Sequence, residues 1–200
     1  MPVKLGGSAG SNPPLIPDVL LTVSTTWSPP YKVKALVRCF GGGGSGAAVQ
    51  TGYYQYTTAA STGGGAGEHS GSILELDPSI TYTIVAGAGG ARKIATAQQV
   101  FPGIAGGNTS FSGSGITTIT ANGGAGGGAL LMPTHTTVYN LPGGAGGSGG
   151  AGALYRHTGG AGGAITKPAI AVNNFNNALS TGGGAVGLYG TGFAGGAITF

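Results

Sequence analysis

The chain has 200 residues, of which 46 are glycine and only 6% are charged, against about 25% charged residues in ordinary globular proteins. A conventional hydrophobic core is therefore not expected, and neither is disorder of the whole chain, because disordered chains combine low hydrophobicity with high charge while this one is 40% hydrophobic. The net charge of +4 comes from scattered basic residues, which argues against nucleic-acid binding.

Residues 1–40 are predicted to form an N-terminal attachment segment and a strand. The prolines of residues 12–17 exclude a helix, and residues 19–23 could form a short strand that either docks on a partner or covers an edge of the domain itself. Residues 32–40 alternate apolar and basic side chains, which predicts a half-buried strand. Cys39 lies on its apolar face and is expected to be a buried, inert thiol.

From residue 41 to residue 200 we predict a glycine-rich domain built on a three-residue repeat, clearest in GGAGGSGGAG at residues 143–152. A period of three is that of an extended helix of the polyproline II type, which has no internal hydrogen bonds. Its backbone groups must therefore bond to parallel copies, with glycine at the two positions of three where copies touch. Such tracts occur at residues 41–46, 63–67, 87–90, 103–107, 123–128, 143–152, 159–163, 182–187 and 195–196.

Short β segments separate several of these tracts. Residues 73–76 and 81–85 are predicted to pair as a hairpin that turns at Asp77-Pro78-Ser79, because proline presets the turn dihedral angle. Phe111 and residues 116–120 form another β-rich segment. The predicted fold is mainly irregular and β, with a β-rich N-terminal segment, stacked polyglycine II helices joined by loops, and almost no α-helix.

An ordered series of motifs over residues 27–128 resembles the glycine-rich domain that recurs in bacteriophage tail proteins. The series consists of Trp27, residues 37–40 before four glycines, residues 65–68, residues 76–90, residues 106–111 and residues 121–126. In architecture the rest of the chain is similar to the tail-fibre-tip adhesins of some phages, in which stacked polyglycine II helices carry receptor-binding loops. The resemblance implies a virion protein of the phage tail, held to other tail or fibre subunits through its N-terminal segment.

If successive glycine tracts run antiparallel, the connections fall alternately at two ends of the bundle. One end then receives residues 47–62, 91–102, 129–142 and 164–181, which are irregular and rich in tyrosine and asparagine, the composition of a recognition surface. The candidate receptor-binding residues are Tyr53, Tyr54, Tyr56, Arg92, Lys93, Phe101, Met132, His135, Tyr139, Asn174 and Phe175. The alternative interpretation is that these aromatic side chains fold back and cover the apolar ends of the tracts.

No catalytic, cofactor or metal site can be assembled from the sequence, so we expect a protein that is not an enzyme. Glycine tracts that match a dinucleotide motif are not followed by a helical pattern. His69, His135 and His157 are far apart in the sequence and have no neighbouring cysteine, and Glu75 and Asp77 flank a predicted turn. No apolar run reaches about 18 residues, so membrane insertion is not expected.

The function expected from the sequence is host-receptor binding by a non-catalytic virion protein, with a protein or a glycan as receptor. The alternative is a structural tail-tip, baseplate or fibre connector without direct receptor contact. A glycine-rich wall or matrix protein is a third possibility, disfavoured because residues 1–6 lack a signal-peptide pattern. We accordingly expect synthesis in the host cytoplasm and a final location in the virion.

Overall fold

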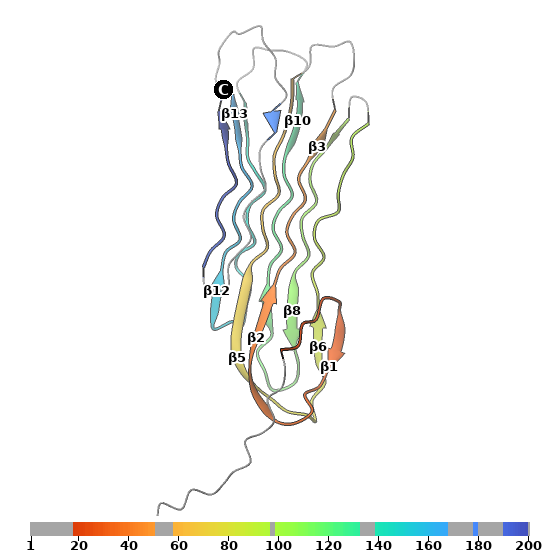
Figure 1. Cartoon of the computed structure of the whole chain (residues 1–200), viewed down its shortest axis with the longest axis vertical. Coiled ribbons are helices and arrows are strands. Elements are labelled where there is room, and N and C mark those ends of the chain that lie inside the picture. The colour runs from red at the N-terminus through yellow and green to blue at the C-terminus, as the bar shows by residue number, and fades with distance from the viewer. Residues whose placement is uncertain are drawn as a thin grey trace, which may run out of the picture.

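The computed structural model describes residues 18–50, 58–96, 99–132, 139–167, 178–179 and 190–199. Within these ranges the chain forms short strands and no α-helix, which confirms the mainly β and irregular fold. Strands gather at the two ends of an elongated molecule, and wavy glycine-rich segments, which we call rods, run between them (Figure 1). We call one end the base, and it carries β2 (Val33–Phe40), β5 (His69–Leu76) and β6 (Tyr82–Val85). We call the other end the loop end, and it carries β3 (Ala48–Val49), β10 (Ala129–Met132) and β13 (Ile165–Lys167).

Two small sheets form the base. One contains β1 (Thr25–Trp27), β6 (Tyr82–Val85), β8 (Thr109–Ser112) and β9 (Ile119–Ala121) in that order. The other contains β12 (Tyr155–His157), β5 (His69–Leu76) and β2 (Val33–Phe40). Their facing sides share the main hydrophobic core, which consists of Cys39, Leu76, Tyr82, Ile84, Phe111, Ile119 and Ala121.

The alternation predicted for residues 32–40 is confirmed in β2. Lys34, Leu36 and Arg38 are exposed, while the side chains between them face the core and Cys39 is buried. Burial raises the pKa of the Cys39 thiol to about 11, because the apolar surroundings disfavour the thiolate.

The predicted hairpin of residues 73–76 and 81–85 is wrong, although the turn between them is present. β5 pairs with β2 and β12, whereas β6 pairs with β1 and β8, so the chain crosses from one sheet to the other at the turn. Asp77 Oδ1 accepts hydrogen bonds from the N–H and the hydroxyl of Ser79 at 2.9 and 2.6 Å. The crossing lets Leu76 and Tyr82 enter the same core from opposite sides.

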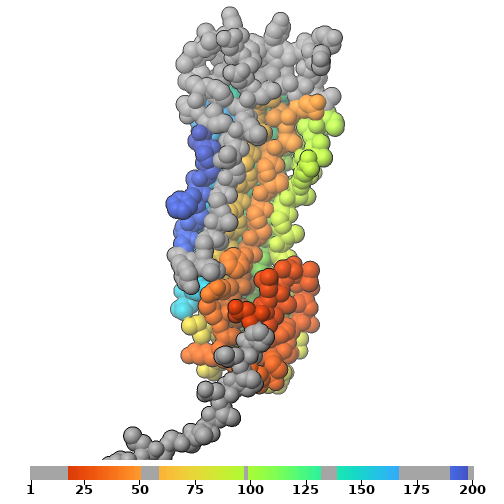
Figure 2. Space-filling view, viewed as in Figure 1, coloured from red at the N-terminus to blue at the C-terminus, as the bar shows by residue number. Residues whose placement is uncertain are grey.

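The strand predicted at residues 19–23 is also absent, since β1 begins at Thr25. β6 offers only four residues for pairing, and the N–H of Ala86 beyond it donates to the Ser24 hydroxyl rather than to a backbone carbonyl. The chain therefore leaves the sheet before residue 24. Val19, Leu20 and Val23 remain 51, 86 and 66% exposed. Figure 2 shows this segment, in red, on the surface of the base.

The rods are held together by hydrogen bonds that repeat every three residues. In the rod of residues 122–128, the N–H groups of Gly124 and Gly127 donate to Gly42 and Ser45 of one neighbour. The carbonyls of the same two glycines accept from Gly106 and Gly103 of a second neighbour, and those of Asn122, Ala125 and Gly128 accept from Glu68, Gly65 and Thr62 of a third. Backbone hydrogen bonds to three neighbouring rods, repeated every three residues, are those of a polyglycine II helix, as predicted.

Glycine is needed where rods meet. A Cβ atom built on Gly44, Gly65 or Gly147 would lie 2.0, 2.0 or 2.2 Å from a backbone oxygen of a neighbouring rod. At Gly43 and Gly46 the nearest atom would be 3.7 and 3.8 Å away, an ordinary contact. The rule of two glycines in three positions therefore follows from backbone-to-backbone packing, and in this first rod the third position, at Gly43 and Gly46, is exposed.

From residue 41 to residue 164 the described rods run alternately up and down, as their connections require. Residues 41–47 lead from β2 at the base to β3 at the loop end, residues 62–68 return to β5, and the following rods continue the alternation (Figure 1). Residues 190–197 form a further rod that leads to β15 (Ile198–Thr199) at the loop end, parallel to the rod that leads to β13. The boundary predicted at residue 40 falls between β2 and the first rod and stays a prediction.

Candidate functional site

Three short sheets close the bundle at the loop end. They contain β10 (Ala129–Met132), β4 (Thr58–Ser61) and β14 (Ala178–Leu179); β11 (Tyr139–Leu141), β13 (Ile165–Lys167) and β15 (Ile198–Thr199); and β3 (Ala48–Val49) and β7 (Val100–Phe101). A second small core of Ala60, Tyr139 and Ile165, with Leu130 and Leu141 against it, joins the first two sheets. The stems of all four predicted loops therefore lie at one end of the molecule.

Six of the predicted receptor-binding residues lie outside the described residues and stay predictions. They are Tyr53, Tyr54, Tyr56, His135, Asn174 and Phe175. The strands that precede and follow their connections are β3 and β4, β10 and β11, and β13 and β14, all at the loop end.

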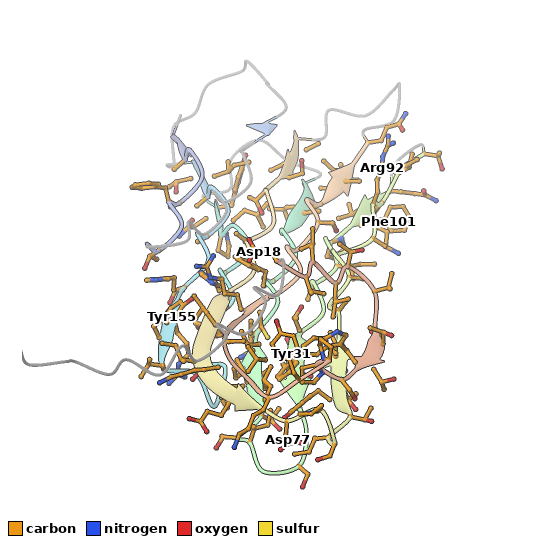
Figure 3. All side chains as sticks on the ribbon, turned by 60° about the horizontal axis from the view of Figure 1, so that its bottom comes forward. Asp18, Tyr31, Asp77, Arg92, Phe101 and Tyr155 are labelled. Atoms are coloured by element: carbon orange, nitrogen blue, oxygen red, sulfur yellow. The ribbon has the colours of Figure 1, made fainter. Side chains whose placement is uncertain are left out.

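Four further candidates are described at the loop end. Arg92 and Lys93 are exposed on the connection that leads to β7. Phe101, in β7 opposite Ala48, is half-buried, and Met132 is the last residue of β10, opposite Thr58. Figure 3 shows Arg92 and Phe101 near one end of the molecule and Asp77 at the other.

Tyr139 is placed differently from the other candidates. Its side chain is 8% exposed and packs in the second core with Ala60 and Ile165, and burial raises the pKa of its phenol. This position matches the alternative interpretation, in which an aromatic ring covers the end of the rods. The buried ring of Tyr139 is therefore not available to contact a receptor.

Sequence reasoning missed one buried charged residue, Glu68. Its side chain is 1% exposed, and Oε2 accepts hydrogen bonds from the N–H groups of Asn122 and Gly150 at 3.0 and 2.9 Å. Oε1 accepts a third from the Ser70 hydroxyl at 3.2 Å. Since two of these donors belong to other segments of the bundle, Glu68 fastens the rods where they enter the base. Its one signal in the sequence is an acid directly after a glycine tract.

The structure also brings two histidines together that are distant in the sequence. His69 of β5 lies opposite His157 of β12, with ring centroids 5.7 Å apart, and His69 stacks on Phe40 at 4.2 Å. His69 is fully buried, so this row of rings packs the junction between base and rods. Within the described ranges no group of three His, Cys, Asp or Glu residues could hold a metal ion. In the same ranges no helix is long and apolar enough to cross a membrane.

Comparison with known proteins gives the family of this chain. A search of the curated proteins finds no match. A family described as a glycine-rich domain matches residues 21–200, which include both sheets of the base, the rods that the structure describes and the sheets of the loop end. This match accords with the rods and their close backbone contacts, and the chain belongs to the glycine-rich domain family.

Proposed function

We propose that this protein is a non-catalytic virion protein of a phage tail or tail-fibre tip, and that it binds a host receptor through the connections at its loop end. One observation carries the proposal. The stems of all four irregular connections emerge side by side from one end of a rigid bundle, and the stems of the β-rich connections emerge from the other. Binding residues are commonly found on loops that a rigid scaffold positions.

The bundle suits this role because its stability comes from the backbone. Backbone hydrogen bonds with N···O distances of 2.7 to 3.1 Å join the rods. The glycines at the contacts have no side chains that would need to repack. Loop sequences can therefore change with little effect on the rods, since long surface loops cost little additional closure entropy. A receptor-binding protein under pressure to change its receptor would benefit from that separation.

The base supplies a reason to expect attachment to another tail or fibre subunit. Val19, Leu20 and Val23 lie close together in the sequence and are largely exposed. Their segment lies on the base, at the opposite end of the molecule from the loop end (Figure 2). Contiguous exposed apolar side chains mark surfaces that contact other proteins. The proposed arrangement has the base held in the virion and the loop end directed toward the host cell.

Adsorption to bacteria tests the proposal. Fluorescently labelled protein is incubated with a panel of bacterial strains, and any strain that binds it is then infected by its phages with and without an excess of the protein. Saturable binding together with fewer adsorbed phages supports a receptor-binding role. Absence of binding to every strain that the parent phage infects contradicts it.

The exposed apolar residues of the base also favour a second candidate, a structural connector of the tail tip, baseplate or fibre. In that case the loop end contacts neighbouring virion subunits and no receptor. Electron microscopy of the particle distinguishes the two, because an adhesin has its loop end at the surface and a connector has it buried between subunits.

A further inference from the structure

The charges of this chain are divided unequally between the two ends of the molecule. All four acidic residues, Asp18, Glu68, Glu75 and Asp77, lie in the base or where the rods enter it. Four of the eight basic residues, Lys32, Lys34, Arg38 and Arg156, lie there as well. The base as a whole is therefore close to neutral.

All the charged residues of the connections at the loop end are basic. The sequence places no Asp or Glu in residues 47–62, 91–102, 129–142 or 164–181, but it places Arg92, Lys93 and Lys167 there. Apart from Lys4 near the N-terminus, these three residues account for the net charge of +4. The fold, by bringing the four connections to one end, turns a scattered excess of charge into a local one.

Arg92 and Lys93 are placed to act on a ligand. Both are exposed, they are consecutive in the chain, and they precede Ile94, which is 64% exposed. Figure 3 shows Arg92 near the end of the molecule, with its side chain directed away from the ribbon. Salt screens exposed charges beyond about 8 Å at physiological ionic strength, so the acids of the base, at the other end of the rods, do not offset these cations.

We infer that the loop end binds an anionic polymer of the cell surface, a sugar chain that carries phosphate or carboxylate groups. The inference rests on the proposed function and names the class of its receptor. Exposed cations attract such a chain and speed its association, and arginine can donate two parallel hydrogen bonds to the oxygens of one phosphate or carboxylate. Because no carboxylate of the loop end competes for the cations, an anionic chain encounters no local repulsion there.

Two matched variants test the inference. R92Q/K93Q and K32Q/K34Q each remove two exposed positive charges, the first pair from the loop end and the second from the base. Binding is measured to immobilised polygalacturonate, which carries carboxylates, to polyphosphate and to neutral dextran. We expect the parent protein and K32Q/K34Q to bind one or both polyanions and not dextran, and R92Q/K93Q to bind about tenfold more weakly. Preference for one polyanion identifies the anionic group.

Salt and a second polymer complete the test. Raising NaCl from about 50 to about 500 mM shortens the screening length and should weaken polyanion binding at least tenfold. Equal losses in the two variants, equal binding to dextran, or preferential binding to double-stranded DNA each overturn the inference. Adsorption to bacteria that is unaffected by salt and by R92Q/K93Q also overturns it, yet leaves the receptor-binding role intact. Absence of adsorption under all conditions contradicts the proposed function itself.

Discussion

Most glycines of the rods lie where a carbonyl oxygen of a neighbouring rod occupies the space that a Cβ atom would need. Among the described glycines only Gly115, Gly149 and Gly152 have a positive φ. Close approach of backbones, and not an unusual backbone conformation, is therefore the main reason for glycine here. The neighbour is a hydrogen-bonded backbone, so it cannot move aside as a flexible side chain would.

A comparison of Gly44→Ala with Gly43→Ala should show whether stability depends on close backbone contact at a glycine or only on the number of glycines. The new Cβ would lie 2.0 Å from the Ala125 oxygen in the first variant and 3.7 Å from the Gly65 oxygen in the second. We expect Gly44→Ala to lose at least about 3 kcal/mol of unfolding free energy and Gly43→Ala to stay within about 0.5 kcal/mol. Thermal unfolding measures the difference as about 6 °C or more. Equal melting temperatures would show that the rods are not in close contact.

Glu68 is the residue whose removal should leave the largest polar defect. In Glu68→Ala the part-buried N–H group of Asn122 and the buried N–H group of Gly150 lose their acceptor, and the loss of a buried acceptor costs about 1–3 kcal/mol. Glu75→Ala, on the exposed face of β5, is the matched control and should change stability by less than about 0.5 kcal/mol. Urea unfolding followed by circular dichroism compares the two, and similar midpoints would rule out the fastening role.

Cys39 should be chemically silent in the folded protein. With its pKa raised to about 11, only about one thiol in a thousand is ionised at pH 8, and the side chain is 3% exposed. We expect no reaction with iodoacetamide over hours at pH 8, and complete reaction within minutes in denaturant. Mass spectrometry counts the modified fraction. Rapid labelling without denaturant would mean that the main core opens easily.

At the scale of elements, the turn after β5 decides how the base is assembled. The Asp77 carboxylate accepts two hydrogen bonds from Ser79. The backbone N–H of Asp77 donates to the Tyr82 hydroxyl at 2.9 Å. These bonds direct the chain from one sheet to the other. A local pattern of apolar residues with a proline turn is the same for a hairpin and for such a crossing, which is why the sequence predicted the turn and not the pairing.

Asp77→Asn should reveal the contribution of this carboxylate through pH. The hydrogen bonds from Ser79 lower the pKa of Asp77 below its usual value. A lowered pKa in the folded state stabilises the protein at pH values above the unfolded pKa of about 3.9, and the stabilisation disappears as pH falls through the folded pKa. The variant should therefore melt below the parent protein at pH 7 and together with it near pH 2. A difference in melting temperature that stays the same at every pH would mean that the effect does not come from the charge of the carboxylate.

At the scale of the whole molecule, rigidity and recognition are assigned to different parts. The backbone contacts between the rods provide the rigidity. We propose that the connections at the loop end provide the recognition. Substitutions in the two parts should then have opposite profiles: loss of folding in the rods and loss of binding alone in the connections.

Gly147→Val and Tyr54→Ala compare the two parts directly. A side chain at Gly147 would meet the Asn122 oxygen at 2.2 Å, so we expect no folded protein by circular dichroism. Tyr54→Ala should melt with the parent protein and adsorb to the susceptible strain several-fold more weakly, as the loss of an aromatic contact implies. A folded Gly147→Val, or full adsorption by Tyr54→Ala, would break the proposed division.

The sequence by itself determined the rods, because a three-residue repeat with glycine at two positions has few other ways to satisfy its backbone groups. It also determined β2 and the turn at Asp77, which are local patterns. Only the tertiary structure decided which strands pair, that His69 meets His157, that Tyr139 is buried, and that Glu68 binds two N–H groups from other segments. These contacts join residues far apart in the chain, and local periodicity carries no information about which distant backbone becomes the neighbour. The same holds for charge: eight basic residues look scattered along the sequence, and the direction of each rod decides the end at which they collect.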